Sequence, residues 1–190
     1  MSYAVDDITY LLPNTLIRWG RSRVARPMTQ LVVVGRVVDV VEGPAWTATE
    51  QDDSVEVAFD DPKAMWKEVH ATIGVDEVIA ATVPADQVVV RFIIDGDQPF
   101  QPARAQLLDT GPMLLPLRRD IGPDGSTAWT ANMHQADLLA DVDARGRMHM
   151  PCVGKRIGRQ LLRNAATLDE LRAAAAQPER IVRLEGGPHG

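Results

Sequence analysis

The segment that most constrains the fold of this chain is Leu31–Glu42, which reads LVVVGRVVDVVE. It is a nearly continuous run of β-branched residues, interrupted by a glycine at Gly35. β-Branched side chains favour strands, and a strand that is apolar on both faces has to be covered on both. A glycine inside such a strand is typical of a small closed barrel, in which one strand must bend. The segment therefore predicts a β-barrel and says nothing about function.

Further strands are expected where short runs alternate or are β-branched between turn residues. These segments are Val55–Phe59, Val69–Ile79, Val88–Ile94, Met113–Leu117 and Thr127–Met133. In the second of them the alternation slips after Glu77, which indicates a bulge or the end of the strand. Pro112 and Pro116 bound the fourth, so we expect it at an edge or at a closing position.

Turns and helices are expected at five places. The pair Gly43-Pro44 should end the first strand, and Asp61-Pro62 should cap a short helix over Pro62–Lys67. Leu138–Val142 and Arg147–Met150 are expected to pair as a hairpin. After Pro151 the apolar period changes to that of a helix, and Thr167 to Glu170 form a capping box that opens a second helix.

These segments predict a mainly β protein with C-terminal α-helices. Helices do not alternate with strands, which disfavours a parallel α/β fold, and the bent first strand favours a small OB-like barrel of five to six strands over a sandwich. The expected organisation is an N-terminal arm over 1–29, the barrel over 30–151, a helical segment over 152–178 and a tail over 179–190.

Charge is distributed unevenly along the 190 residues, whose formal net charge is −6. Residues 37–61 carry eight acidic and no basic side chains, whereas residues 144–190 carry nine basic and four acidic ones. Such an asymmetry marks either a partner surface or two parts of the chain that fold onto each other.

No apolar stretch is long enough to cross a bilayer, and the single Cys152 excludes an intrachain disulfide. We therefore expect a cytoplasmic protein without membrane contact.

The frame LVVVGRVVDVVEG, then VHATIGVDEVI, VVVRF, a GPMLLPLRR segment and a late LDELRAA helix is similar to a loose set of uncharacterised bacterial proteins. The resemblance covers about residues 30–176. It implies an OB-like barrel, and it implies no catalytic residue because none belongs to the shared pattern.

No motif indicates a cofactor or a metal site. His149 and Cys152 lie three residues apart, but one thiol and scattered histidines lack the paired spacing of structural zinc. A thiol-dependent enzyme that uses Cys152 and His149 is the weakest of three hypotheses, and a buried inert cysteine is the better interpretation.

Basic residues near both ends of the chain are candidates for contact with an anion or a nucleic acid. They are Arg18, Arg21, Arg23, Arg147, Lys155, Arg156 and Arg159. Among the strands, Arg36 and Arg91 look isolated, and aromatic residues make up only 5% of the chain. A single-stranded nucleic-acid binder on an OB-like barrel is therefore the second hypothesis.

Candidates for a partner surface are Asp52 and Asp53 of the acidic segment, Trp46, which with Trp66 flanks that segment, and Trp19, which lies among arginines. The leading hypothesis is a non-catalytic binding or assembly module that contacts a protein partner or another copy of itself. It requires no cofactor. Basic ends and an acidic middle could meet head to tail.

Overall fold

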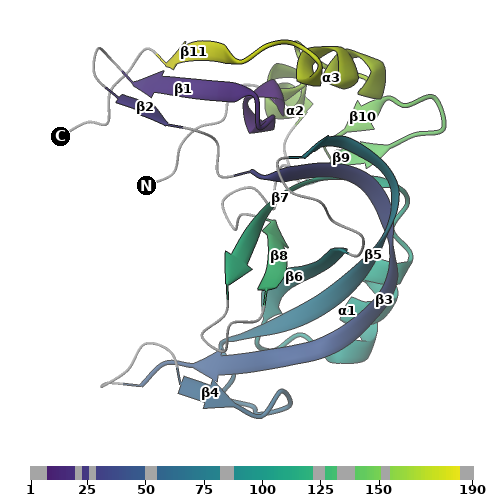
Figure 1. Ribbon diagram of the computed structural model, residues 1–190. Coiled ribbons are helices and arrows are strands. Elements are labelled where there is room, and N and C mark those ends of the chain that lie inside the picture. The colour runs from purple at the N-terminus through teal and green to yellow at the C-terminus, as the bar shows by residue number, and fades with distance from the viewer. Residues whose placement is uncertain are drawn as a thin grey trace.

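The structure, a computed structural model, describes residues 8–19, 23–25, 29–49, 55–81, 88–121, 127–131, 140–150 and 155–184. Its central feature is a closed five-stranded β-barrel in the order β3-β5-β6-β8-β7 (Figure 1). The strands are β3 (Leu31–Thr47), β5 (Trp66–Ala81), β6 (Val88–Asp95), β7 (Met113–Ile121) and β8 (Thr127–Ala131). β7 closes the barrel by pairing with the start of β3, while β6 and β8 run parallel and the other barrel pairs are antiparallel.

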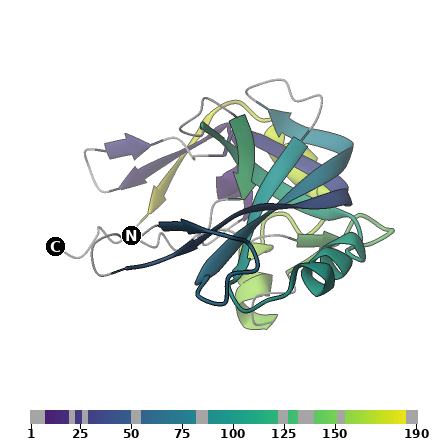
Figure 2. The ribbon, with the colours of Figure 1, turned by 90° about the horizontal axis from the view of Figure 1, so that it is seen from below.

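The remaining elements extend or cover the barrel. They are η1 (Ile8–Leu11), β1 (Thr15–Trp19), β2 (Arg23–Ala25), β4 (Val55–Val57), α1 (Phe100–Leu108), β9 (Ala140–Val142), β10 (Met148–His149), α2 (Lys155–Leu161), α3 (Leu168–Ala175) and β11 (Arg180–Leu184). β4 adds to the far end of β3, and β9 and β10 add to β7. α1 connects β6 to β7 and lies on the opposite side of the molecule from β1 and β2 (Figure 2).

Two hydrophobic cores explain why the start of β3 is apolar on both faces. Leu31 and Val33 point into the barrel, where they pack with residues such as Val69, Val90 and Leu115. The alternate side chains of β3, Val32 and Val34, pack in a second core outside the barrel. That core is completed by η1, the β9–β10 hairpin, α2 and α3, including Ile8, Leu11, Met148, Leu161 and Leu171.

Gly35 lies where β3 leaves this double coverage, and the backbone there leaves no space for a side chain. A Cβ at this position would lie 2.6 Å from the Gly74 carbonyl oxygen and 2.7 Å from Ile73 Cγ2 of β5. The register between β3 and β5 also shifts between Val34 and Gly35. Irregularities of this kind bend a strand and increase its twist, which lets β3 curve around the barrel.

The first and last described segments of the chain form a layer on top of the barrel. β1 pairs in parallel with β11 and antiparallel with β2 (Figure 1). The Asn14 side-chain amide donates hydrogen bonds to the carbonyl oxygens of Ala174, Ala175 and Gln177, at 3.0, 3.2 and 3.0 Å. These carbonyl oxygens lie in the last turn of α3 and just after it. Carbonyls at the end of a helix commonly accept hydrogen bonds from side chains. The N-terminal segment therefore caps α3.

The prediction of a mainly β protein with a small barrel and C-terminal helices is confirmed. The strands expected around Val69–Ile79, Val88–Ile94 and Met113–Leu117 are present, and the third of them takes the closing position. The hairpin of β9 and β10 and the capping box at Thr167 and Glu170 are also present.

Two local expectations were wrong. β3 does not end at Gly43-Pro44 but passes through it with a register shift between Glu42 and Ala45. Residues 62–67 form turns and the start of β5 instead of a helix, because the Asp61 carboxylate accepts a hydrogen bond from the Lys63 backbone at 2.7 Å, as in an Asx turn.

Sequence patterns also missed elements that depend on distant contacts. α1 was not predicted because its segment contains two prolines, at Pro99 and Pro102, which fit the N-cap and the first helical turn. β1, β2 and β11 were missed because β1 and β11 pair across more than 160 residues of sequence.

Candidate binding surface

A polar cluster lies on the outer wall of the barrel, across three neighbouring strands. Arg118 of β7 pairs in register with Thr130 of β8, which pairs in register with Arg91 of β6. Residues directly opposite each other point to the same face of a sheet, and the intervening side chains, such as Val90, Leu117 and Trp129, fill the barrel core. Two guanidinium groups therefore flank one hydroxyl on the outside. We call Arg91, Arg118, Asp120 and Thr130 the outer-wall cluster.

Hydrogen bonds in the outer-wall cluster converge on one oxygen. Asp120 Oδ2 accepts from Arg91 Nη2 at 3.3 Å, from Arg118 Nη2 at 3.4 Å and from the Thr130 hydroxyl at 3.2 Å. Arg118 Nε also donates to the Thr130 hydroxyl at 3.2 Å. Charge-assisted hydrogen bonds are commonly about 2.7–2.9 Å long. The three hydrogen bonds to this shared oxygen are longer and therefore weaker. The cluster holds two positive charges and one negative charge.

Arg91 Nε is buried and has no hydrogen-bond partner. The rest of its side chain is 22% exposed, and the side chains of Arg118 and Asp120 are 33% and 35% exposed. Sequence reasoning interpreted Arg91 as isolated, and this was wrong. Alternation along β6 indicates that Arg91 points outward, but no sequence signal reveals the parallel pairing that places Thr130 beside it.

The same outward row continues onto β5. His70 pairs in register with Arg91, and its Nε2 lies 3.3 Å from Glu68 Oε2. Gly43 passes under this ring, since a Cβ there would lie 2.8 Å from His70 Nε2. Ile93, opposite Glu68, is 43% exposed. The wall of β5 and β6 is therefore mixed in character, with apolar, acidic and basic groups in adjacent positions.

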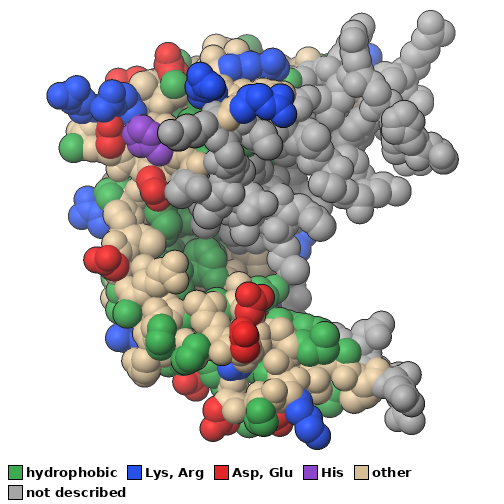
Figure 3. Space-filling view, turned by 180° about the vertical axis from the view of Figure 1, so that it is seen from behind, with side chains coloured by type: hydrophobic (Ala, Val, Ile, Leu, Met, Phe, Trp, Pro, Cys, Tyr) green, Lys and Arg blue, Asp and Glu red, His purple; other side chains and the backbone are tan. Residues whose placement is uncertain are grey.

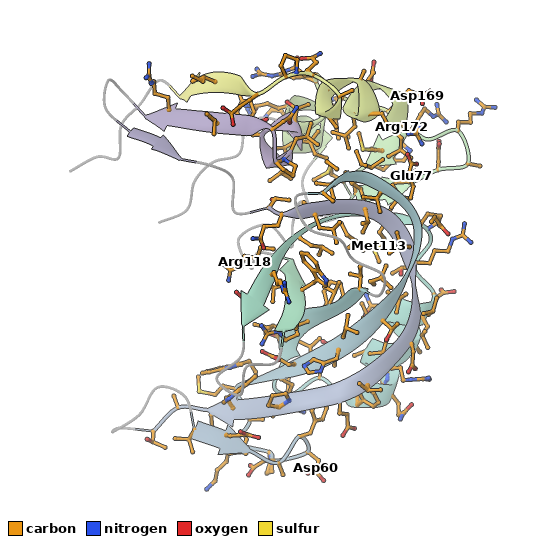
Figure 4. All side chains as sticks on the ribbon, viewed as in Figure 1. Asp60, Glu77, Met113, Arg118, Asp169 and Arg172 are labelled. Carbon is orange, nitrogen blue, oxygen red and sulfur yellow. The ribbon has the colours of Figure 1, made fainter. Side chains whose placement is uncertain are left out.

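The predicted partner residue Trp46 lies at the end of β3 that carries β4. It is directly opposite Trp66 of β5, and both side chains are partly exposed. Met65, the neighbour of Trp66, is 56% exposed. Trp46 also pairs in register with Glu56 of β4. Asp60 lies at the same end of the barrel, at the bottom of Figure 4. Asp52 and Asp53 lie outside the described residues, and only the backbone of Trp19 is described, in β1.

The predicted basic contact residues do not gather at the outer-wall cluster. Arg18 is on β1, Arg147 is in the β9–β10 hairpin, and Lys155, Arg156 and Arg159 are on α2. Arg156 and Arg159 are exposed. Arg21 lies outside the described residues, and the side chains of Arg23 and Lys155 are not described.

Arg147 has a structural role in the hairpin. Asp143 accepts hydrogen bonds from the backbone N–H groups of Arg145 and Arg147, at 2.8 and 2.9 Å, and from Arg147 Nε at 2.9 Å. These hydrogen bonds lower the pKa of Asp143 from its usual 3.8 to about 2. Gly146 completes the turn with a φ of 70°. Arg147 is therefore part of the turn that joins β9 to β10.

The structure does not test His149 and Cys152 as a pair, and a thiol-dependent site there stays a prediction. His149 is 62% exposed, and its Nε2 lies 3.8 Å from Asp143 Oδ2. Cys152 lies outside the described residues. Within the described part of the chain, no group of three or more His, Cys, Asp or Glu side chains is arranged to hold a metal ion.

No protein family, curated protein or solved structure matches this chain. The resemblance to OB-like bacterial proteins therefore stays a prediction. Among the helices in the described residues, none is both long and apolar enough to cross a bilayer.

Proposed function

We propose that this chain is a non-catalytic binding and assembly module of the cytoplasm, built on an OB-like barrel, and that its preferred contact is with a protein, including another copy of itself. The OB-like assignment is supported by the strand order β3-β5-β6-β8-β7, the parallel pairing of β6 with β8, and a helix between the third and fourth barrel strands. A five-stranded barrel with this connectivity is a scaffold for binding surfaces.

The observation that supports self-assembly is the separation of the two charged segments in space. The acidic segment 37–61 includes β4 and the lower part of β3, whereas the basic segment 144–190 forms α2, α3 and β11 at the opposite end of the molecule (Figure 1). Figure 4 shows the same separation between Asp60 and Arg172. Among the described residues, no carboxylate of 37–61 pairs with a basic side chain of 144–190. Opposite charges at opposite ends favour a head-to-tail contact between copies.

Exposed apolar side chains supply the second component that such an interface needs. Val38, Val41 and Met65 lie in or beside the acidic segment, and each is more than half exposed. Interfaces combine an apolar centre with a charged rim that guides encounter. The space-filling view shows hydrophobic, acidic and basic side chains interspersed over this lower part of the molecule (Figure 3).

Analytical ultracentrifugation over a concentration series, at low and high salt, tests this proposal. We expect mass to rise with concentration and the association to weaken with salt, because exposed charges are screened. Glu56→Lys with Asp60→Lys should abolish association, as should Arg156→Glu with Arg159→Glu. Mixing the two variants should restore it, and Asp109→Lys, outside both segments, is the control. A monomer at every concentration and both salts would reject self-assembly.

The outer-wall cluster favours a second candidate, a single-stranded nucleic-acid binder. Arg91 and Arg118 on the barrel wall, with Trp46 and Trp66 on the outward face of β3 and β5, supply the cations and stacking rings that such proteins use. Fluorescence anisotropy with labelled single-stranded DNA and RNA at two salt concentrations distinguishes the candidates. Binding that weakens steeply with salt and is lost in Arg118→Gln would favour this function.

A further inference from the structure

We propose that the outer wall at the β4 end of the barrel binds an extended basic segment of a partner protein. Two cationic side chains of that segment reach a carboxylate at each end of the site, and the side chain between them packs on two tryptophans. The site is the row of Glu56, Trp46, Trp66 and Asp95, which we call the tryptophan row. This inference rests on the proposed protein-binding function and adds the chemistry of the partner.

The strand register places the four side chains of the tryptophan row on one face. Trp46 of β3 pairs with Glu56 of β4 on one side and with Trp66 of β5 on the other. Trp66 in turn pairs with Asp95 of β6. Residues directly opposite each other in antiparallel strands point to the same face of the sheet. The row therefore crosses four strands, with two indoles in the middle and a carboxylate at each end.

The tryptophan row faces solvent and not the barrel interior. The neighbouring pair of Ala45 and Lys67 is buried, at 0% and 6% exposed, and side chains alternate between the two faces along a strand. Both indoles are partly exposed, and the two carboxylates are exposed. Tryptophan is enriched at the energetic centres of protein interfaces, so a pair of them on an outer wall indicates a contact surface.

The charges of β3 and β4 around the row select a cationic partner. Residues 37–61 carry eight acidic side chains and no Lys, Arg or His. In the turn between β4 and β5, Lys63 is the one basic residue, and two acidic residues, Asp60 and Asp61, precede it. Within the described part of the chain, neither Glu56 nor Asp95 forms an ion pair.

The basic side chains of β5 and β6 are directed elsewhere. Lys67 points into the barrel, where its ammonium donates to the Gln98 carbonyl oxygen at 3.4 Å. Further along the outer face, His70 Nε2 lies 3.3 Å from a Glu68 oxygen, and Arg91 donates to Asp120 at 3.3 Å. Both carboxylates of the tryptophan row are therefore available to a cation from outside the chain.

The spacing of the row fits two cationic side chains on one extended segment. Three strand spacings separate the Cα atoms of Glu56 and Asp95, roughly 14 Å. In an extended peptide, the side chains at positions i and i+4 point the same way and are about 13 Å apart. Arginine or lysine at these positions reaches the carboxylates, and the side chain at i+2 lies on the indoles. Indole faces also attract guanidinium and ammonium groups.

A single-stranded nucleic acid is the competing occupant. Its bases would stack on Trp46 and Trp66, but its phosphates would approach Glu56 and Asp95. Like charges placed against each other across an interface oppose binding. The flanking carboxylates therefore favour a basic peptide over an oligonucleotide at this row.

The direct test is a titration of the full chain with the peptide acetyl-Arg-Ser-Leu-Ser-Arg-amide at constant ionic strength, followed by ¹H–¹⁵N correlation NMR of the indole N–H groups. We expect saturable shifts for Trp46 and Trp66, whose signals Trp46→Phe and Trp66→Phe assign, and none for Trp129 in the barrel core. The isomer acetyl-Arg-Arg-Ser-Leu-Ser-amide has the same charge and should bind several-fold more weakly. No saturable shift at Trp46 and Trp66, or equal binding of the two peptides, would overturn the site.

Carboxylate variants test whether the row itself supplies the charge. Asp95→Asn and Glu56→Gln each remove one exposed charge and should weaken peptide binding several-fold. Asp109→Asn, just after α1, makes the same change in net charge away from the row and should leave binding unchanged. Equal weakening in Asp95→Asn and Asp109→Asn would contradict the proposal. Trp46→Leu should also weaken binding, and if it does not fold, the carboxylate variants are sufficient.

Two further measurements separate this site from the other proposals. An oligodeoxythymidine that shifts the two indole signals when the peptide does not would assign the row to nucleobases and overturn the proposal. Arg156→Glu with Arg159→Glu keeps the row intact and should bind the peptide at least as tightly as the natural chain, so loss of binding there would also overturn it. Self-association without peptide binding would reject this site alone. Peptide binding by a chain that stays monomeric would support the site and reject only self-assembly.

Discussion

Arg172 of α3 donates two parallel hydrogen bonds to Glu77 of β5, from Nε to Oε1 at 2.6 Å and from Nη2 to Oε2 at 2.5 Å. Arg172 Nη1 also contacts Asp169, one turn earlier on α3. The pairing lowers the pKa of Glu77 and raises that of Arg172, in both cases chiefly through the hydrogen bonds between them. This ion pair joins the C-terminal helical layer to the barrel (Figure 4).

The Arg172–Glu77 pair should have a small but measurable coupling energy. Both side chains are more than one-third exposed, which limits the expected value to about 1 kcal/mol or less despite the bidentate geometry. A double-mutant cycle with Arg172→Gln and Glu77→Gln in urea unfolding measures it. The Arg36–Asp76 pair, at 3.6 Å and more exposed, is the control and should couple more weakly. Equal coupling in the two pairs would show that the bidentate geometry adds nothing.

Asp143 should make stability depend on pH at the acidic end of the scale. Its pKa is about 2 in the folded chain and lies near 3.8 without its hydrogen bonds. The carboxylate therefore stabilises the fold above about pH 4, and this contribution is lost as pH falls toward 2. Thermal unfolding of the natural chain and Asp143→Asn should differ most at neutral pH and converge near pH 2. A difference that does not change with pH would contradict this assignment.

Gly35→Ala should destabilise the barrel, because the new methyl group would overlap the Gly74 carbonyl oxygen and the Ile73 side chain. Overpacking of this kind costs about 1–3 kcal/mol. Gly111→Ala is a matched control, since nothing lies within 4 Å of the added carbon. Chemical denaturation of the two variants should show a loss at Gly35 and almost none at Gly111. Similar losses would mean that β3 can shift away from β5 at this point.

Lys67→Met should leave stability unchanged or raise it. Lys67 is 6% exposed, its ammonium donates to the Gln98 carbonyl oxygen at 3.4 Å, and it lies 5.2 Å from the centre of the Phe59 ring. Burying an ammonium is costly, and one long hydrogen bond with a cation–π contact offsets only part of that cost. Methionine keeps the length of the chain and packs against Phe59. A loss of about 2 kcal/mol or more would show that the charge itself stabilises this end of the barrel.

The sequence determined the parts of this protein that depend on local chemistry. Three features depend on only a few neighbouring residues and could be predicted from them. They are the β-branched run at Leu31–Glu42 with Gly35, the alternation after Val69 and the Thr167 capping box. Each is present in the structure because short-range propensity and burial agree there. The outward direction of the Arg91 side chain could likewise be predicted from the alternation along its strand.

Only the tertiary structure decided which distant segments meet. The parallel pairs β6 with β8 and β1 with β11 are non-local, and their register depends on the whole barrel. For that reason the sequence could not place Thr130 between Arg91 and Arg118, or Arg172 against Glu77. It also could not place the acidic and basic segments at opposite ends. The chemistry of each residue is local, but a site forms only where the fold brings residues together.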